Sequence, residues 1–312
     1  MVKYVYICSA GHSGSTLLDL MIGSHSKAES LGEVSHLPKN ISLNSLCGCG
    51  KSVQSCSMWQ DVLTMVSNNL GTDILKNPYA LNLGYINPNI VVDKIHKTKI
   101  YQLRRKILHG LWYIELRFGL NFLRPFLKSN YKGIENNFLV YDAVRKVLNS
   151  DIVVDSSKHY LKAIGLYKRM PDKVKIILLT RDGRGVFYSN LKRNLPKKKS
   201  LNTWKHHYNR ALSLFKDNID EKSIIHVQYE TIAISPRDEL KRICNFLGID
   251  FEEAMLRYAA KPNHTTNGNE KVRFRESSEI KLDTSWCEHL SDEDQRYFES
   301  RAGQLNRKLG YK

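Results

Sequence analysis

A glycine-rich run near the start of the chain is the strongest chemical feature of the sequence. It reads Ser9-Ala10-Gly11-His12-Ser13-Gly14-Ser15-Thr16-Leu17-Leu18. The apolar residues 2–9 are typical of a buried strand, and residues 15–23 are typical of a helix. A strand, a loop and a helix in this order direct several backbone N–H groups and a helix N-terminus at one point, which makes an anion site. The alternative is a simple turn in which a serine caps the helix.

The side chains of this loop indicate an anion site that differs from the loop of nucleoside triphosphatases. Gly11 and Gly14 allow close approach of the backbone, and Ser13, Ser15 and Thr16 add hydroxyl donors. No lysine follows Gly14, whereas the pattern G-x-x-x-x-G-K-[ST] supplies a lysine for the β- and γ-phosphates. We therefore expect a ligand that has no γ-phosphate and needs no Mg²⁺.

A second group of candidate residues follows the apolar segment 174–180. It reads Arg181-Asp182-Gly183-Arg184-Gly185-Val186-Phe187-Tyr188-Ser189. An arginine at the carboxyl end of a strand points into the crevice where open α/β sheets bind ligands. Ser189 lies eight residues later, two turns into the next helix, so its hydroxyl and the Arg181 guanidinium can clamp one phosphate. Alternatively, Arg181 and Asp182 form only a salt-bridged turn.

Strand and helix patterns alternate along the parts of the chain that carry these residues. Strands are predicted at 2–9, 151–155, 174–180 and 224–228, and helices at 160–169, 186–193, 204–216 and 237–247. The alternation predicts an α/β fold with three layers, in which helices cover both faces of a parallel sheet, as in P-loop nucleotide kinases.

The stretch from about residue 58 to residue 148 differs in character and predicts a helical insertion within a single domain that spans residues 1–312. Helical patterns in it cover 58–70 and 93–127. Outside it, Lys197–Lys199 is predicted to be a basic loop, and residues 261–285 are predicted to be a long irregular loop.

The two motifs together resemble the sulfotransferases that use 3′-phosphoadenosine 5′-phosphosulfate (PAPS). In that family the first loop, residues 11–18 of this chain, holds the 5′-phosphosulfate. The arginine and the serine, which correspond to Arg181 and Ser189, hold the 3′-phosphate. The resemblance spans roughly residues 1–60 and 150–300 and does not extend to the insertion. One departure is His12, because many relatives carry arginine or lysine at this position.

Three further segments agree with the resemblance. His226–Glu230 resembles a segment whose tyrosine, Tyr229 in this chain, lies near the adenine. Val154–Lys158 (VDSSK) resembles an element of the bacterial branch of the family. His264–Arg273, followed by Asp283 and Trp286, resembles the loop that covers the cofactor, which makes Arg273 a candidate ligand of the donor.

The resemblance implies transfer of a sulfuryl group from PAPS to an acceptor hydroxyl, with no metal required. By analogy with phosphoryl transfer, such catalysis depends on positioning and on stabilising charge, and a base must accept the hydroxyl proton. Glu33 lies 21 residues after His12, the separation at which tyrosylprotein sulfotransferases carry their base. His12 is the alternative base. Lys158 is the candidate for stabilising the leaving oxygen, and a solvated side chain is the alternative for both Glu33 and Lys158.

The chain is strongly basic, with 48 Lys and Arg against 31 Asp and Glu and a formal net charge of +17. A field of this sign attracts anions, so we expect an anionic or extended acceptor such as a polysaccharide or acidic peptide, and small molecules stay open. Two other classes compete. A nucleotide-dependent kinase of similar fold is disfavoured by the missing loop lysine. A non-catalytic nucleic-acid-binding protein would need a recognised module, and none is evident, so no nucleic-acid partner is expected.

Three cysteines, Cys47, Cys49 and Cys56, lie close together in the sequence. Their spacing, C-x-C-x₆-C, is not a usual zinc-finger pattern, and His36 is the nearest candidate for a fourth ligand. A zinc site, a disulfide, and buried or free thiols therefore all stay open, with thiols favoured.

We find no signal peptide and no spanning segment in the sequence, so the cytoplasm is the expected location. The basic segment Lys94–Lys106 leads into an aromatic helix, a pattern that can lie on a membrane surface. More often such a helix is solvated on one side and packed on the other, and this is the interpretation we favour.

Overall fold

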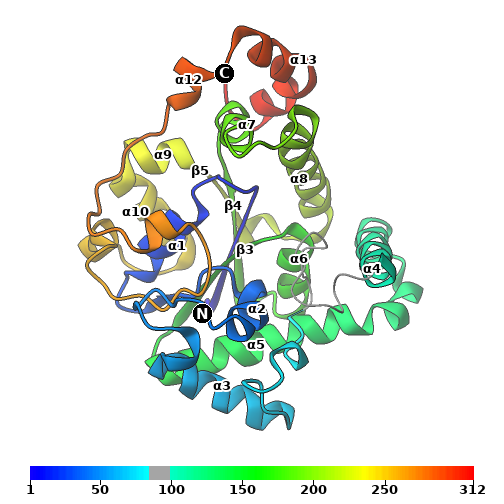
Figure 1. Cartoon of the computed structure of the whole chain (residues 1–312), viewed down its shortest axis with the longest axis vertical. Helices are drawn as coiled ribbons and strands as arrows, with labels where there is room; N and C mark the ends of the chain where they lie inside the picture. The colour runs from blue at the N-terminus through cyan, green and yellow to red at the C-terminus, as the bar shows by residue number, and fades with distance from the viewer. Residues whose placement is uncertain (84–98) are drawn as a thin grey trace.

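A parallel sheet of five strands forms the centre of the protein (Figure 1). The computed structural model describes residues 1–83 and 99–312, and within them the strand order is β2-β3-β1-β4-β5. The strands are β1 (Tyr4–Ser9), β2 (Ala28–Ser30), β3 (Ile152–Lys158), β4 (Val174–Thr180) and β5 (Ile224–Gln228). Because every neighbouring pair is parallel, the carboxyl ends of all five strands lie at one edge of the sheet.

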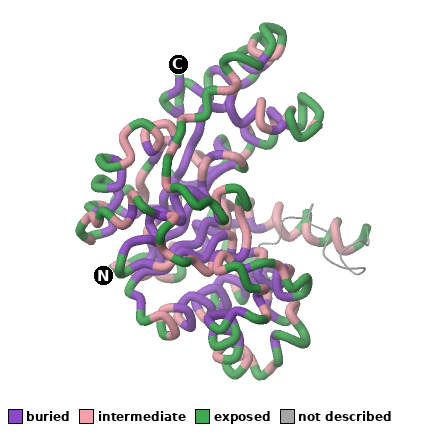
Figure 2. Tube along the Cα trace, turned by 60° about the vertical axis from the view of Figure 1, so that its left-hand side comes forward, coloured by how far each residue is buried: buried purple, intermediate pink, exposed green. Residues whose placement is uncertain are grey.

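Helices cover both faces of this sheet, which confirms the predicted three-layer α/β fold. Side chains of β1 alternate between the faces: Val5 and Ile7 join one core, and Tyr4 and Tyr6 join the other. Figure 2 shows buried residues concentrated along the strands and the inner sides of the helices. The first layer contains α1 (Ser15–Gly23), α9 (Tyr229–Ile234) and α10 (Pro236–Leu247), and the second contains α6 (Tyr160–Arg169), α7 (Gly183–Leu191), α8 (Lys197–Asn218) and α13 (Asp292–Lys308).

The insertion between β2 and β3 is helical, as predicted. Its helices are α2 (Leu37–Ser42), α3 (Ser57–Leu70), α4 (Lys99–Phe118) and α5 (Lys128–Leu148). α3 packs on α5 beside the sheet, and α4 lies at the periphery in Figures 1 and 2. Residues 94–98 of the predicted basic segment lie outside the described residues, and the rest of it forms the start of α4. No helix within residues 1–83 and 99–312 combines the length and the apolar character needed to cross a bilayer.

Several elements differ from the predictions. β2 is only three residues long and gave no pattern. α5 was not predicted, because Asn136 and Asn137 are buried on it and interrupt its apolar face. Lys197–Lys199, predicted to be a loop, instead forms the first turn of α8, since the preceding Pro196 is compatible with a helix start.

The predicted long irregular loop is largely as expected. Residues 261–285 contain one helical turn, α11 (Glu270–Arg273), and the short helix α12 (Ser285–His289) begins at their end. Short 3-10 turns complete the secondary structure of the described residues. They are η1 (Val34–His36), η2 (Val53–Ser55), η3 (Pro78–Ala80), η4 (Asn121–Leu127), η5 (Glu221–Ser223) and η6 (Glu253–Arg257).

Candidate active site

The glycine-rich loop joins β1 to α1 at the carboxyl edge of the sheet, and its backbone is unusual. His12 (φ 63°) and Gly14 (φ 84°) both adopt the left-handed conformation, which is uncommon for a residue with a side chain. A Cβ atom at Gly14 would lie 2.6 Å from the ring of Tyr229, so glycine is required there for two reasons. An N–H of Arg181 donates to the carbonyl of His12 at 3.1 Å and thereby supports the left-handed turn. Residues held in such conformations are often found at functional sites.

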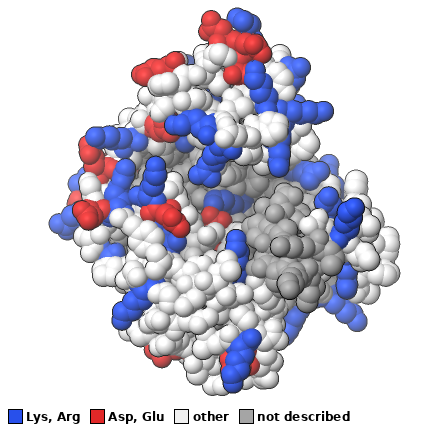
Figure 3. All heavy atoms as spheres, in the orientation of Figure 1, with Lys and Arg blue, Asp and Glu red and all other residues white. Residues whose placement is uncertain are grey.

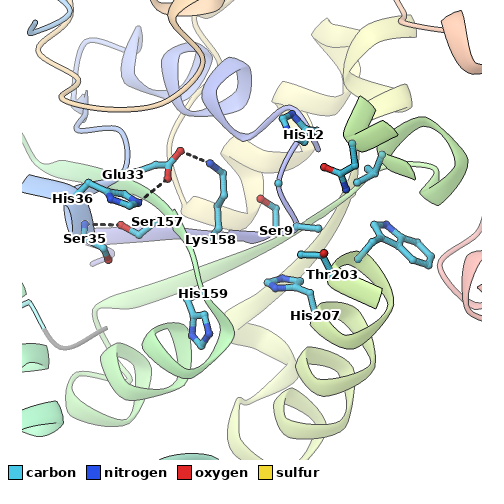
Figure 4. Close-up of a pocket in the computed structure, with 15 residues that line it drawn as sticks. Ser9, His12, Glu33, Ser35, His36, Ser157, Lys158, His159, Thr203 and His207 are labelled. Atoms are coloured by element: carbon cyan, nitrogen blue, oxygen red, sulfur yellow. Dashed lines mark hydrogen bonds and ion pairs between the residues drawn. The ribbon is translucent and has the colours of Figure 1, made fainter. Parts of the chain in front are cut away.

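Two cavities open beside this loop. The larger, the phosphate-loop cavity, has a volume of about 790 Å³, and the smaller, the histidine cavity, has a volume of about 330 Å³ (Figure 4). Both are lined by Gly11, His12, Glu33 and Lys158. Two ligands, one in each cavity, would therefore meet at these four residues.

The phosphate-loop cavity brings together most of the residues that the sequence analysis proposed for the donor. Those that line it are Gly11, His12, Gly14, Ser15, Thr16, Arg181, Ser189 and Tyr229. The Arg181 guanidinium lies 4.8 Å from the centre of the Tyr229 ring and donates to the Asp283 carboxylate at 2.8 Å. The Ser189 hydroxyl donates to the carbonyl of Gly185 at 2.8 Å.

Two predicted residues lie elsewhere. The Ser13 hydroxyl is fully buried against the hydroxyl of Tyr208, at 3.2 Å, so it faces the core and not the cavity. Arg273 is also buried, and it does not line either of the two cavities. Its guanidinium donates to the carbonyls of Thr265 and Leu46, so this side chain holds two loops together. Its placement gives no support to the predicted contact with the donor, which stays a prediction.

Four further cations line the phosphate-loop cavity and were missed: Arg193, Lys271, Arg275 and Lys281. Arg193 follows Ser189 by four residues, the spacing that puts two side chains on one face of a helix, so this signal was present in the sequence. Lys271 and Arg275 flank Arg273 in the loop around α11. Only the folded structure shows that Lys271 and Arg275 line the cavity and that Arg273 does not.

Glu33 and Lys158 form an ion pair where the two cavities meet (Figure 4). Glu33 lies three residues after the end of β2, and Lys158 is the last residue of β3, with a left-handed backbone (φ 75°). His36 lies on the other side of the carboxylate, 3.4 Å from it. Burial by itself raises the pKa of Glu33, but the Lys158 ammonium and the His36 ring together outweigh it, and the pKa falls to about 2.

His12 is neutral near pH 7 in this environment. Burial, followed by the nearby cations Arg193, Lys158 and Arg181, lowers the pKa of His12 to about 4. Two other histidines that line the histidine cavity also have lowered pKa values. Burial lowers the pKa of His207 to about 4, and that of His159 falls well below its ordinary value. Apart from Glu33, His36 and Lys158, the polar groups of this cavity are thus uncharged near pH 7.

A buried network of polar groups contacts the residues next to the Glu33–Lys158 ion pair. The Asp155 carboxylate accepts from Lys162 at 2.8 Å and from the Tyr141 hydroxyl at 2.5 Å. Ser157, the neighbour of Lys158, donates its backbone N–H to Asp155 at 2.7 Å. The Ser157 hydroxyl also accepts from the backbone N–H of Ser35 at 3.0 Å, near Glu33 (Figure 4). The network therefore joins both halves of the ion pair to the same buried charge.

Comparison with known proteins points to one family. A model described as "Sulfotransferase family" matches residues 130–253, which include Lys158, Arg181, Ser189 and Tyr229. A "putative protein-tyrosine sulfotransferase" of Caenorhabditis elegans is 29% identical over 157 residues, covering 46% of this chain and 59% of the relative. A Caenorhabditis briggsae protein of the same description is 26% identical over 156 residues, covering 46% of this chain and 55% of its own length. The matched part thus spans little more than half of these curated relatives.

Solved structures agree on the fold. The sulfotransferase domain of the Synechococcus PCC 7002 olefin synthase has a TM-score of 0.56 at 19% identity, over 100% of this chain and 96% of that domain. The sulfotransferase domain of the curacin biosynthetic pathway has a TM-score of 0.50 at 18% identity, over 100% of this chain and 99% of that one. Likeness at this level of identity establishes a shared α/β fold.

The buried network yields a stability prediction. Lys162→Met should destabilise the protein by about 3–5 kcal/mol, because it leaves the Asp155 carboxylate buried without a cation. Removing both charges, in Lys162→Met with Asp155→Asn, should cost clearly less than Lys162→Met alone. The exposed Lys132 on α5 provides a matched control, and Lys132→Met should change stability by no more than about 0.5 kcal/mol. Urea unfolding followed by circular dichroism measures all three, and equal stability of Lys162→Met and wild type would contradict the prediction.

Proposed function

We propose that this chain is a sulfotransferase that transfers a sulfuryl group from PAPS to an acceptor hydroxyl, which the match of residues 130–253 to the sulfotransferase family model supports. One observation carries the proposal: a cation-rich cavity and a largely uncharged cavity share a wall made of Gly11, His12, Glu33 and Lys158. The first suits a nucleotide with several negative charges, and the second suits a hydroxyl compound. Lys158, which can bind negative charge, and Glu33, which can accept a proton, lie where the two cavities meet.

The residues of the phosphate-loop cavity fit the donor. The backbone and hydroxyl groups of residues 14–16 at the start of α1 suit the 5′-phosphosulfate. Arg181 already binds an anion, the Asp283 carboxylate, in the position that suits the 3′-phosphate. Ser189 and Arg193 lie in the same cavity, and the Tyr229 ring offers a surface for stacking. The donor supplies an activated sulfuryl group, and the chain supplies the charge and the orientation.

We propose that Lys158 leaves Glu33 when the donor is bound and stabilises the oxygen that departs from sulfur. A lysine ammonium can stabilise negative charge that develops in the transition state. Its departure would free the Glu33 carboxylate and raise its pKa, because burial is then opposed only by His36. Glu33 would thus become a better acceptor for the hydroxyl proton at the moment that the donor is in place. His12 is the alternative base and, as a neutral imidazole, a hydrogen-bond donor to the sulfuryl group.

The acceptor hydroxyl is proposed to enter the histidine cavity. Side chains there that can orient a hydroxyl compound include Ser35, Thr203 and His207. A cavity of about 330 Å³ accommodates one sugar or one tyrosyl ring, so an extended acceptor such as a polysaccharide or peptide would leave most of its length outside. A screen with ³⁵S-labelled PAPS against glycans, tyrosyl peptides and small phenols identifies the class.

Neither competing class gains support. A kinase would need ATP and Mg²⁺, and the loop has no lysine after Gly14. On the face shown in Figure 3, Lys and Arg side chains occur at many separate places and form no continuous stripe of the kind that follows a nucleic-acid backbone.

The donor assignment predicts a loss of affinity in Arg181→Ala. Removal of the guanidinium should weaken binding of 3′-phosphoadenosine 5′-phosphate by about 2–4 kcal/mol, roughly 30- to 1000-fold in Kd. Ser189→Ala should cost about 1 kcal/mol. Arg237→Ala is the control, because Arg237 is an exposed arginine of α10 that pairs with Glu253. Calorimetric titration without added divalent metal measures each Kd, and full affinity in a folded Arg181→Ala protein would remove the cofactor assignment.

The assignment of the base predicts a different result for Glu33 and His12. Glu33→Gln should lower kcat by roughly 10²–10⁴-fold with little change in donor affinity, since it removes only the proton acceptor. His12→Ala should raise the donor KM as well as lower kcat. Glu29→Gln is a matched control, because Glu29 pairs with Lys261 outside both cavities. If Glu33→Gln is nearly fully active while His12→Ala is inactive with unchanged donor affinity, His12 is the base.

The Glu33–Lys158 pair also predicts a pH dependence. Activity requires ionised Glu33 and is lost as pH falls through its pKa, which is about 2 in the free enzyme, so kcat/KM for the donor should show no acid limb from Glu33 above pH ~5. Lys158→Met removes the main cause of the low pKa, so the limb should move to higher pH. Lys158→Arg keeps the cation and should keep the limb low. Initial rates in overlapping buffers test this, and identical profiles for Lys158→Met and wild type would contradict it.

A further inference from the structure

Three cysteines and one histidine from distant parts of the chain meet outside both cavities. Cys47, Cys49 and Cys56 lie between α2 and α3, and His264 lies in the loop before α11. One possible ligand atom from each lies within 4.8 Å of the other three. His36 is the nearest candidate for a fourth ligand in the sequence, but its side chain lies against Glu33 instead.

The distances fit a tetrahedral metal. The sulfurs of Cys47 and Cys56 are 3.8 Å apart, and Nδ1 of His264 lies 3.8 Å and 3.3 Å from them. Zinc with Zn–S of about 2.3 Å and Zn–N of about 2.0–2.1 Å places two sulfurs roughly 3.8 Å apart and a sulfur and a nitrogen roughly 3.6 Å apart. A disulfide would need sulfurs about 2.05 Å apart, whereas all three cysteines are free.

One of the three cysteines lies at a helix N-terminus. Cys56 directly precedes α3, where the positive end of the helix dipole favours a thiolate. The thiolate is the form of sulfur that binds a metal.

A buried cation completes the surroundings. Arg273 donates to the carbonyl of Leu46 at 2.9 Å, next to Cys47. Three thiolates, one neutral histidine and a divalent metal carry a net charge of −1, and a buried charge needs a partner. The guanidinium of Arg273 lies where it can serve as that partner.

We propose that Cys47, Cys49, Cys56 and His264 bind one zinc ion in a closed, structural site. Four protein ligands leave no open position for a substrate, so the metal has no part in the chemistry. Thiolate and imidazole ligands in a tetrahedral arrangement select zinc over the hard cations Mg²⁺ and Ca²⁺.

The site ties the loop that covers the phosphate-loop cavity to the segment between α2 and α3. The N–H of Gly48 donates to the carbonyl of Thr265 at 2.8 Å, and a Cβ at Gly48 would lie 1.8 Å from the Asn263 side chain. Trp59 donates to the carbonyl of His264 at 2.9 Å. A few residues later the same loop reaches the cavity, where the N–H of Asn269 donates to the Thr16 hydroxyl at 3.0 Å. The zinc would thus fix the start of a segment whose end lines the cavity.

Metal content of the wild-type protein is the first test. Protein purified under reducing conditions without chelator, from zinc-supplemented medium, should contain one zinc per chain by inductively coupled plasma mass spectrometry. Replacement by Co²⁺ should give a sulfur-to-cobalt charge-transfer band and the strong visible bands of a tetrahedral site. Metal at background level would overturn the proposal. Six thiols titrating in denaturant would then indicate free cysteines, and four would indicate one disulfide.

Variants then identify the ligands. Cys47→Ser, Cys56→Ser and His264→Ala should each lose the bound zinc, whereas His264→Cys should retain it, because a thiolate replaces the imidazole. Cys244→Ser is the matched control, since Cys244 is a buried cysteine that contacts Met255 away from the cluster, and it should keep one zinc per chain. Zinc that stays at one per chain in both Cys47→Ser and His264→Ala would show binding elsewhere and overturn the assignment.

A last measurement separates this site from the catalytic proposal. Removal of zinc from wild type should speed amide hydrogen exchange in residues 263–275, whether or not the protein transfers sulfuryl groups. Unchanged exchange in that loop would contradict the proposed anchoring.

Discussion

One buried carboxylate, that of Asp155, is the constraint on which the geometry of the site depends. It is almost fully inaccessible, and a buried charge is tolerated only with a full set of partners. Those partners come from different elements: Lys162 from α6, Tyr141 from α5, and Ser157 from the end of β3 itself. Ser157 also binds the backbone beside Glu33 through the N–H of Ser35. The requirement to compensate Asp155 therefore fixes both sides of the site, and helix α5 of the insertion is part of its support.

The two cavities differ in the charged groups that line them. Arg193, Lys158 and Arg181 lie close enough to His12 to lower its pKa, so the positive charge of the phosphate-loop cavity comes from lysine and arginine side chains and not from His12. Glu33 is ionised beside Lys158, which also lines the phosphate-loop cavity. Movement of a single ammonium between Glu33 and the leaving oxygen would couple donor binding to the strength of the base. This coupling needs no large conformational change, because Glu33 and Lys158 line both cavities.

Local sequence patterns predicted the parts of the fold and the site that are themselves local. The turn from β1 to α1 and the segment from Arg181 to Ser189 each belong to one strand-loop-helix unit, so their residue types and spacing indicate both structure and chemistry. Parts that depend on tertiary contacts were not predictable in this way. β2 is a strand only because it pairs with β3, and His264 meets the cysteines only through a contact across more than 200 residues. Lys271 and Arg275 line the phosphate-loop cavity, whereas Arg273 does not. This difference depends on how an irregular loop packs, and no periodic sequence pattern predicts it.

His12 and Arg193 lie against the same cavity but come from different elements. His12 is an imidazole whose pKa is about 4, so the loop itself brings no fixed charge. Arg193 lies two residues after the end of α7, lines the same cavity, and is the first among the charged groups that lower the pKa of His12. The fixed positive charge beside His12 therefore comes in part from Arg193, which belongs to another element. A neutral His12 held between Arg193 and Lys158 can then donate a hydrogen bond without adding to the repulsion among the cations, which a further arginine in the loop would increase.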